Sequence, residues 1–494
     1  MNRKFTFRFL ALIALSFAQA ITLRSQTQIG TDILPDAADM EGYLEGLAMD
    51  EQGERMVIGT TIFDEERRIY SLVRTYAWNG EAWLPMGGDL HRELREKGSS
   101  ISVDMSPDGD YVAVGIPRND PTDGRPGKVH VYAWSGAEWE SLGEEIEGEE
   151  SGIETGDLCG ASVALSTSGQ RLVIGCPFAT GNEAEKAGHA QVFQWDGEGW
   201  SKLGQALVGE RSFAQAGNAV SISGDGNVLA VGGLKFGDNP SSVTLFGLED
   251  QQWVQKGEDI VSGYSRFFSR WMDLSADGRR LSIGSDFDTF MLRETTSKAR
   301  VFEWDSDTWK QLGPTLSDAI GHRYASIAVA LSGDGTRLAF GIPGADDGGE
   351  DSGLVKLLEW RDEGWFQVGN DIPGEAAMQG AGVSAALSAD GNRVAFGSFN
   401  YIGVKVFSFS TVSTRMLPGS VEWQVYPNPT DGELFFSGIQ ENRIRVLDAL
   451  GRTVKIAEWK GASLQISDLA DGVYFIQAYI DGFISTKKVV KKRF

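Results

Sequence analysis

Histidine and cysteine, which build many metal and catalytic sites, are scarce in this chain. Among its 494 residues are only four histidines and two cysteines. The histidines stand far apart, without the spacing of zinc ligands or of a Ser-His-Asp centre. The sequence therefore predicts neither a zinc site nor a triad hydrolase.

Basic residues are also few. Lysine and arginine number 45 against 69 acidic residues, and the net charge of -24 is concentrated in residues 21–410. Because phosphate binding needs a basic surface, nucleic acid is excluded as a partner. Solubility outside the cell explains such a charge, and attraction of calcium or a cationic partner to acidic loops is the alternative.

No apolar run approaches the ~20 residues that a transmembrane helix needs. At the N-terminus, Arg3, Lys4 and Arg8 precede the apolar stretch 9–18, and Ala18-Gln19-Ala20 follows. This order is typical of a cleaved signal peptide. We expect residues 1–20 to be removed and the mature protein to have no transmembrane segment.

Repetition is what the sequence has in abundance. A small and apolar run, a Ser-x-Asp-Gly turn or a variant of it, and a second apolar run recur seven times. The turn glycines are Gly53, Gly109, Gly169, Gly226, Gly278, Gly335 and Gly391. Each copy predicts four strands bounded by turn residues, at a period typical of propeller blades. The first strand alternates small with large residues, so neighbouring blades are expected to stack.

The count of strands predicts how the copies close. Six copies end in a strand of the type Trp-x-x-Leu-Gly-x-x-Ile, whereas the seventh ends after Phe409 without one. Residues 28–33 have the same Ile-Gly-x-x-Ile spacing. We therefore expect an all-β, seven-bladed propeller over residues 27–410, closed by its N-terminal strand, which leaves no open sheet edge.

The repeats also resemble a known family. Residues 163–175 and 129–139 carry its "LS-x-DG-x-x-VA-x-G" and "V-x-V-Y-x-W" patterns. They are similar to the FG-GAP blades of integrin α-like propellers, in a bacterial form. The resemblance implies the fold, but the calcium loops of that family are missing, because the repeats offer only tight turns such as residues 106–109. The turn also differs from the sialidase Asp-box.

A linker at residues 411–420 precedes a C-terminal segment of different composition, residues 421–494. Its landmarks are Tyr426, Pro427, Asn428, Pro429, Gly451, Gly472, Tyr474, Lys487 and Lys488. This order resembles the C-terminal sorting domain of the type IX secretion system, and the strand pattern predicts a small β-sandwich. The resemblance implies export through the periplasm by the type IX machinery to the bacterial cell surface or the medium.

Loop lengths predict where a ligand binds. The links from strand two to strand three and from each blade to the next are long and varied, and these links share one face of a propeller. Two of them break the acidic pattern with aromatic and basic residues, namely Arg266, Phe268, Arg270, Trp271, His322, Arg323 and Tyr324. Such residues suit a glycan or a carboxylate-bearing partner. Local packing and ion pairing are the alternative.

Two further sites each have a plain alternative. Asp346, Asp347, Glu350 and Asp351 form an acidic loop that either binds calcium, the one cofactor the sequence suggests, or is merely solvated. Cys159 and Cys176 come within a residue or two of facing each other if the blade-three turn pairs Ser166 with Arg171. They form a disulfide, or else two buried free thiols.

Tryptophan pairs bracket the turn between strands three and four in five blades: Trp78/Trp83, Trp134/Trp139, Trp195/Trp200, Trp304/Trp309 and Trp360/Trp365. Their regular recurrence favours blade packing over the stacking of sugar rings.

Acidic residues at one first-strand position give the only hint of catalysis. Asp104 and Asp273 stand where the other copies have alanine or serine. Paired carboxylates cleave glycosides, but three blades separate these two, so we expect no enzyme. The sequence favours a secreted or surface binding and adhesion module; a glycan hydrolase or lyase is the alternative, and a structural surface-layer component is a third.

Overall fold

The computed structural model describes most of the chain. The described residues are 24–34, 41–63, 66, 68–94, 101–117, 126–148, 156–180, 184–233, 241–261, 271–288, 295–321, 327–399, 403–411, 424–437, 442–448, 453–461, 463–480 and 483–492. The chain divides into two compact units, Met1–Val412 and Ser413–Phe494. Within the described ranges every regular element is a β-strand, and no helix is long and apolar enough to cross a membrane.

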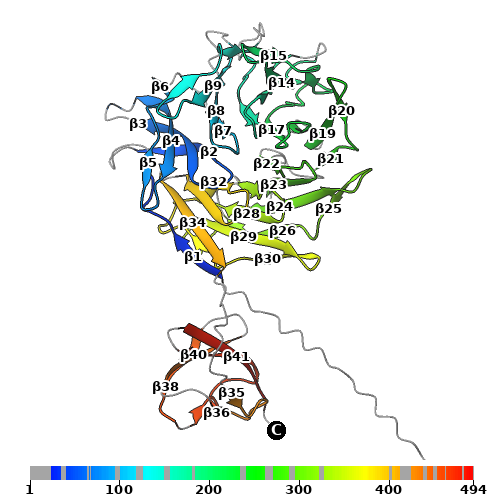
Figure 1. Cartoon of the computed structure of the whole chain (residues 1–494). Helices are drawn as coiled ribbons and strands as arrows, with labels where there is room; N and C mark the ends of the chain where they lie inside the picture. The colour runs from blue at the N-terminus through cyan, green and yellow to red at the C-terminus, as the bar shows by residue number, and fades with distance from the viewer. Residues whose placement is uncertain are drawn as a thin grey trace, which may run out of the picture. The chain divides into compact units, whose positions relative to one another are not determined.

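The first unit consists of seven antiparallel sheets, the blades (Figure 1). Blade 1 contains β2 (Glu41–Met49), β3 (Arg55–Phe63), β4 (Ile69–Trp78), β5 (Trp83–Pro85) and β6 (His91–Leu94). Blade 2 contains β7 (Ser102–Met105), β8 (Tyr111–Ile116), β9 (Lys128–Trp134), β10 (Trp139–Ser141) and β11 (Ile146–Glu147). Blade 3 contains β12 (Ser162–Leu165), β13 (Arg171–Cys176), β14 (His189–Trp195), β15 (Trp200–Lys202) and β16 (Leu207–Val208).

The remaining blades repeat the plan. Blade 4 contains β17 (Ala219–Ile222), β18 (Val228–Gly233), β19 (Ser242–Glu249), β20 (Gln252–Gln255) and β21 (Ile260–Val261). Blade 5 contains β22 (Trp271–Leu274), β23 (Arg280–Asp288), β24 (Thr295–Trp304), β25 (Trp309–Gln311) and β26 (Leu316–Gly321). Blade 6 contains β27 (Val329–Leu331), β28 (Arg337–Ile342), β29 (Leu354–Arg361), β30 (Gly364–Gln367) and β31 (Ile372–Pro373). Blade 7 contains β32 (Ala381–Leu387), β33 (Arg393–Ser398), β34 (Val404–Thr411) and β1 (Arg24–Gln28).

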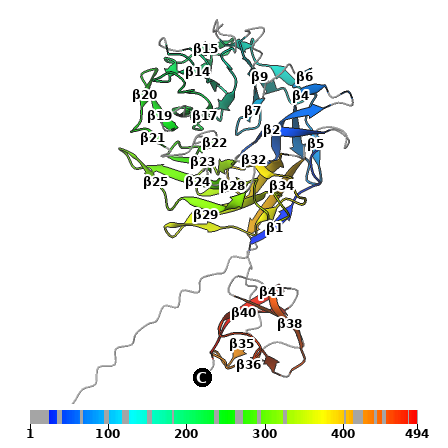
Figure 2. The same ribbon diagram turned by 180° about the vertical axis from the view of Figure 1, so that it is seen from behind.

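The first strands of the blades form the innermost ring. Each contacts the first strand of the next blade, and β32 of blade 7 contacts β2 of blade 1. Figures 1 and 2 show the blades following one another around this ring. The repeats therefore form a closed seven-bladed β-propeller whose first strands line the central channel.

The N-terminal strand closes the ring, as predicted. β1 pairs with β34 from Arg24 opposite Thr411 to Gln28 opposite Phe407. Beyond the strand, Ile33 and Val404 exchange two backbone hydrogen bonds of 2.9 and 3.0 Å. β1 thus occupies the place that a fourth strand fills in the other six blades.

The fourth strand itself differs from the prediction. It is not continuous: in blade 2, β10 and β11 both pair with β9 and are separated by a short break. Gly143 lies in this break with φ of 81°, and an added Cβ there would stand 2.7 Å from the Trp195 ring of blade 3. The strand breaks because its glycine turns aside to seat the tryptophan pair of the next blade.

This seat is hydrogen bonded in six blades, which supports the predicted packing role of the tryptophans. In each, the indole Nε1 of the fourth strand donates to a main-chain carbonyl of the preceding blade at 2.9 to 3.1 Å. The donors are Trp83, Trp139, Trp200, Trp253, Trp309 and Trp365, and the acceptors are Ile29, Met86, Leu142, Leu203, Lys256 and Leu312. In blade 7, which has no such tryptophan, Gln26 accepts the N–H of Asn370 at 2.7 Å.

The turns between the first and second strands lock the same blades together at one face. The second strand begins six positions after the first ends in every blade. An arginine two residues after the turn glycine donates to the glycine carbonyl of the next blade in five cases: Arg55, Arg171, Arg280, Arg337 and Arg393.

Backbone hydrogen bonds also run from turn to turn around this face. Six of the seven turns donate an N–H to the next turn, and the seventh cannot, because Pro107 has no N–H. The short-turn face is thus a nearly continuous hydrogen-bonded ring.

The second unit is a small β-sandwich, as predicted. One sheet contains β35 (Gln424–Tyr426), β36 (Glu433–Ser437) and β39 (Leu464–Gln465), and the other contains β37 (Asn442–Leu447), β38 (Thr453–Trp459), β40 (Gly472–Ile480) and β41 (Phe483–Lys491). The fully buried side chains of its core are Leu434, Ile444, Val446, Ile466, Ile476 and Val489.

Candidate functional site

Two carboxyl groups lie in the wall of the central channel. Asp104 on β7 and Asp273 on β22 occupy one position of the first strand; the other blades place Ala48, Ala164, Ser221, Ala330 and Ala386 there. Each carboxyl accepts a main-chain N–H from the first strand of the next blade at 2.7 Å, Asp104 from Leu165 and Asp273 from Leu331. Both carboxyls therefore also bind neighbouring blades together.

The channel strongly disfavours the charge of these groups. Burial raises the pKa of Asp104 to about 7, and the negative charge of Asp273 adds to the effect. Burial likewise raises the pKa of Asp273 to about 6. Both carboxyls therefore titrate closer to neutral pH than an ordinary aspartate does.

The acidic residues in the loop of blade 6 differ in their exposure to solvent. Asp346, Asp347 and Glu350 are exposed, whereas Asp351 is fully buried. Asp346 accepts the main-chain N–H of Asp351 at 2.8 Å. Three carboxylates do not converge on one point here: among the described residues, the one group of three potential metal ligands that lie within reach of each other is elsewhere, in blade 3.

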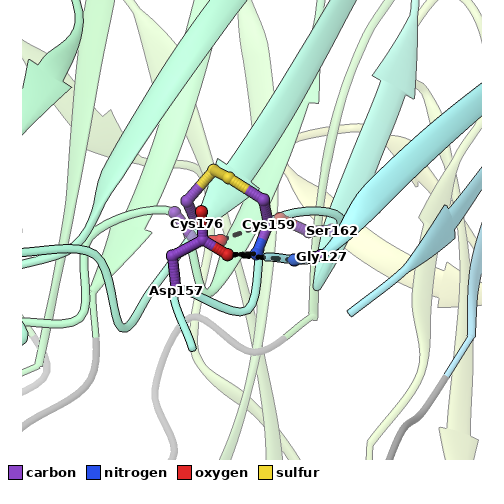
Figure 3. Close-up of a disulfide and its surroundings, with 6 residues drawn as sticks. Gly127, Asp157, Cys159, Ser162 and Cys176 are labelled. Atoms are coloured by element: carbon purple, nitrogen blue, oxygen red, sulfur yellow. Dashed lines mark hydrogen bonds between the residues drawn. A yellow bond between two sulfur atoms is a disulfide. The ribbon is translucent and has the colours of Figure 1, made fainter. Parts of the chain in front are cut away.

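That group surrounds a disulfide. Cys159 and Cys176 are bonded to each other, and the imidazole of His189, opposite Cys176 in the sheet, lies beside them. Asp157 fixes the approach to Cys159 by accepting the main-chain N–H groups of Cys159 and Gly127 at 3.0 and 3.1 Å (Figure 3). Ser162 pairs with Gly175, which is the register that the sequence predicts from the blade-three turn.

Most of the predicted arginine and aromatic patch lies outside the described residues. The patch residues that lie outside are Arg266, Phe268, Arg270, His322, Arg323 and Tyr324. Gly451, a landmark of the tail, also lies outside the described residues. Trp271 is described: it begins β22, is half-buried, and packs against the core between blades 5 and 6. It stands where the other blades have glycine, alanine or serine, on the same side of the strand as Asp273.

A shallow groove of about 480 Å³ lies between blades 4 and 5. Its lining includes Leu248, which stands where five other blades have the first tryptophan of the pair. Lys256 lines it, with Nζ 4.9 Å from the centre of the Trp304 ring. Glu249 and Asp307 also line the groove.

The sorting landmarks of the tail meet at its last strand. The amide of Asn428 donates to the carbonyl of Lys488 and accepts the N–H of Val490, at 2.8 and 2.9 Å. Tyr426 is half exposed and stacks on Phe435. Tyr474 is buried and donates its hydroxyl to Ala470, while Lys487 and Lys488 lie on β41 and Gly472 begins β40.

Two features of the structure were not predicted from the sequence. The arginines that donate to the turn of the next blade were readable from the sequence, because arginine recurs two residues after the turn glycine in five copies. The position of His189 beside the disulfide was not, because only the pairing of β13 with β14 brings it there.

Comparison with known proteins identifies the tail. Residues 424–492 match the family described as the secretion system C-terminal sorting domain. The match confirms a type IX sorting tail, so the protein is handled by that secretion machinery and is secreted or held at the cell surface. A comparison with curated proteins found no match.

Solved structures resemble the chain in fold. The C-terminal WD40 domain of Sif2 is 9% identical over 79% of this chain and 99% of that chain, with a TM-score of 0.42. A periplasmic gluconolactonase from Pseudomonas aeruginosa is 14% identical over 92% of this chain and 100% of that chain, with a TM-score of 0.43.

Proposed function

We propose that the propeller is a binding or adhesion module of FG-GAP type, which recognises an extracellular glycan or protein through its long-loop face. The sorting tail supplies the location for this role, since it directs export. The resemblance of the repeats to integrin α-like blades supports a recognition function, and the family itself remains part of the proposal.

The observation that carries the proposal is the contrast between the two faces. On the short-turn face every first turn has the same length, and six of the seven donate a main-chain hydrogen bond to the next turn. On the other face the link from strand two to strand three varies, from Phe63–Ile69 in blade 1 to Cys176–His189 in blade 3. Variable loops on a rigid scaffold are the usual place of recognition.

A glycan array and a pull-down from cell surfaces, both with residues 21–494, would test the proposal. Arg266→Ala and Trp271→Ala alter the predicted patch, and Gln52→Ala is the matched control, because Gln52 is exposed in a turn of the opposite face. We expect the two patch variants to lose binding and the control to keep it. Unchanged binding by both patch variants would reject the patch, and loss in the control alone would move recognition to the short-turn face.

A glycan-active hydrolase or lyase is the second candidate, and the channel carboxyls are the observation that favours it. An acid with a pKa of about 7 and a second with a pKa of about 6 share one channel. Their hydrogen bonds to neighbouring blades give them a structural role as well. If glycans bound on the array are cleaved, and Asp104→Asn or Asp273→Asn abolishes cleavage without loss of binding, the enzyme interpretation replaces the binding one.

A further inference from the structure

Asp351 presents an electrostatic problem that the fold does not solve. Its side chain is fully buried, and neither carboxylate oxygen has a hydrogen-bond partner among the described residues. Burial of a carboxylate without a compensating partner is strongly unfavourable, and buried polar groups in proteins are nearly always paired. A ligand from outside the chain can supply the partner that the described residues do not.

The loop holds the carboxylate in place. The main chain of Asp351 is saturated: its N–H donates to Asp346, and its carbonyl accepts from Gly380 of blade 7 at 3.0 Å. Glu350 and Ser352 accept N–H groups from the same blade-7 segment, Met378 and Ala381, at 2.7 and 2.9 Å. These three hydrogen bonds fix the main chain of Asp351 and of both its neighbours against blade 7.

Blade 3 shows that these hydrogen bonds to the next blade do not require an acid at this position. Lys186 has the same left-handed backbone as Asp351, with φ of 51° against 50°. Its carbonyl accepts the N–H of Gln215 from the next blade, as the carbonyl of Asp351 accepts that of Gly380. Lys186 extends over the Phe178 ring, with Nζ 4.9 Å from its centre. The same loop geometry is thus compatible with a lysine, and the acid at position 351 needs a separate reason.

We propose that Asp351 binds a hard divalent cation of the Ca²⁺ class at this loop of blade 6. Asp346, Asp347 and Glu350 of the same loop are exposed and add negative charge near it in the sequence. Because no three carboxylates of the described residues converge here, the remaining ligands are main-chain carbonyl oxygens and water, which Ca²⁺ accepts readily.

The site is distinct from the strand-one turns. In blade 6 the turn carboxylate, Asp334, is already occupied: it accepts the hydroxyl of Ser332 at 2.6 Å and the N–H of Thr336 at 2.9 Å. The acidic loop instead joins β28 to β29. A cation there would fasten blade 6 to blade 7 and would fix one edge of the long-loop face.

Calorimetric titration of CaCl₂ and MgCl₂ into chelator-treated residues 21–494, with thermal unfolding in the same buffers, tests the site. We expect one Ca²⁺ per chain, with affinity near the ~10⁻⁴ to 10⁻³ M of extracellular calcium modules, and a rise in Tm. Asp351→Asn is expected to weaken Ca²⁺ binding at least ~100-fold, and the exposed control Asp347→Asn less than ~5-fold, because only the first removes the buried ligand.

Either of two results would overturn the proposal: no Ca²⁺ or Mg²⁺ binding by the parent chain up to ~10 mM, or unchanged binding by Asp351→Asn. If that variant does not fold, Asp351→Ser gives the same comparison. A parent chain that binds neither ion, together with an Asp351→Asn chain of higher Tm, would assign the carboxyl to a proton instead.

Discussion

Replacing Asp104 by asparagine is expected to stabilise the propeller at neutral and higher pH. Burial in the channel raises the pKa of Asp104 from 3.8 to about 7. Between these values the folded chain holds a proton that the unfolded chain has released. Folding stability therefore falls as pH rises through this window, and the contribution of the protonated group is lost above about pH 7.

The magnitude follows from the width of the window. Each pH unit is equivalent to ~1.4 kcal/mol, so a shift of about three units makes the ionised carboxyl cost ~4 kcal/mol at pH 8. Asparagine cannot ionise, and its amide oxygen still accepts the N–H of Leu165. We expect Asp104→Asn to raise the free energy of unfolding by up to ~4 kcal/mol at pH 8 and to leave it nearly unchanged at pH 4.

Urea unfolding followed by tryptophan fluorescence from pH 4 to pH 8 measures the effect. Asp273→Asn is the partner experiment, with a smaller gain because its pKa is raised only to about 6. Glu140→Gln, at an exposed position of the same blade as Asp104, is the control and should not change the pH dependence. The same pH dependence in Asp104→Asn as in the parent chain, or an equal destabilisation at every pH, would refute the reasoning.

Three further predictions concern contacts within and between the blades. Gly30→Ala places a Cβ 2.9 Å from the Trp78 ring at a φ of 75° and should cost ~2 to 4 kcal/mol, whereas Gly80→Ala, with open space around it, should cost only ~1; equal losses in urea unfolding would contradict this. Trp139→Phe removes the Nε1 hydrogen bonds to blade 1 and should lower stability by ~1 to 3 kcal/mol, so an unchanged Tm would show that ring packing alone suffices. Reduction of the disulfide, or the double change Cys159→Ser and Cys176→Ser, should cost ~3 kcal/mol, given a separation of 17 residues; a reduced chain as stable as the oxidised one would argue against a stabilising role.

The fold was predictable because its determinants are local and repeated. Gly53 and its counterparts adopt positive φ in every first turn, so the same residue type recurs at a readable period. The closing strand was predictable for the same reason: Gly30 has positive φ and seats Trp78 and Trp83 as the other fourth-strand glycines seat theirs.

The site was less predictable because it depends on contacts between distant residues. In the sequence the acidic loop consists of four similar residues. Only its hydrogen bonds to blade 7 distinguish buried Asp351 from its exposed neighbours. Asp104 and Asp273 are separated by three blades along the chain. Only closure of the ring lets the charge of one act on the other.

The closing pair β1 and β34 also determines when the ring can close during folding. Its partners stand near opposite ends of the propeller chain, Gln28 opposite Phe407, so the last contact of the ring forms only when the seventh repeat is present. A chain cut short before Val404 would hold six complete blades and two unsatisfied edges. Such an edge is prone to aggregation. Only a chain that contains the seventh repeat can therefore pair its first strand with β34 and close the ring.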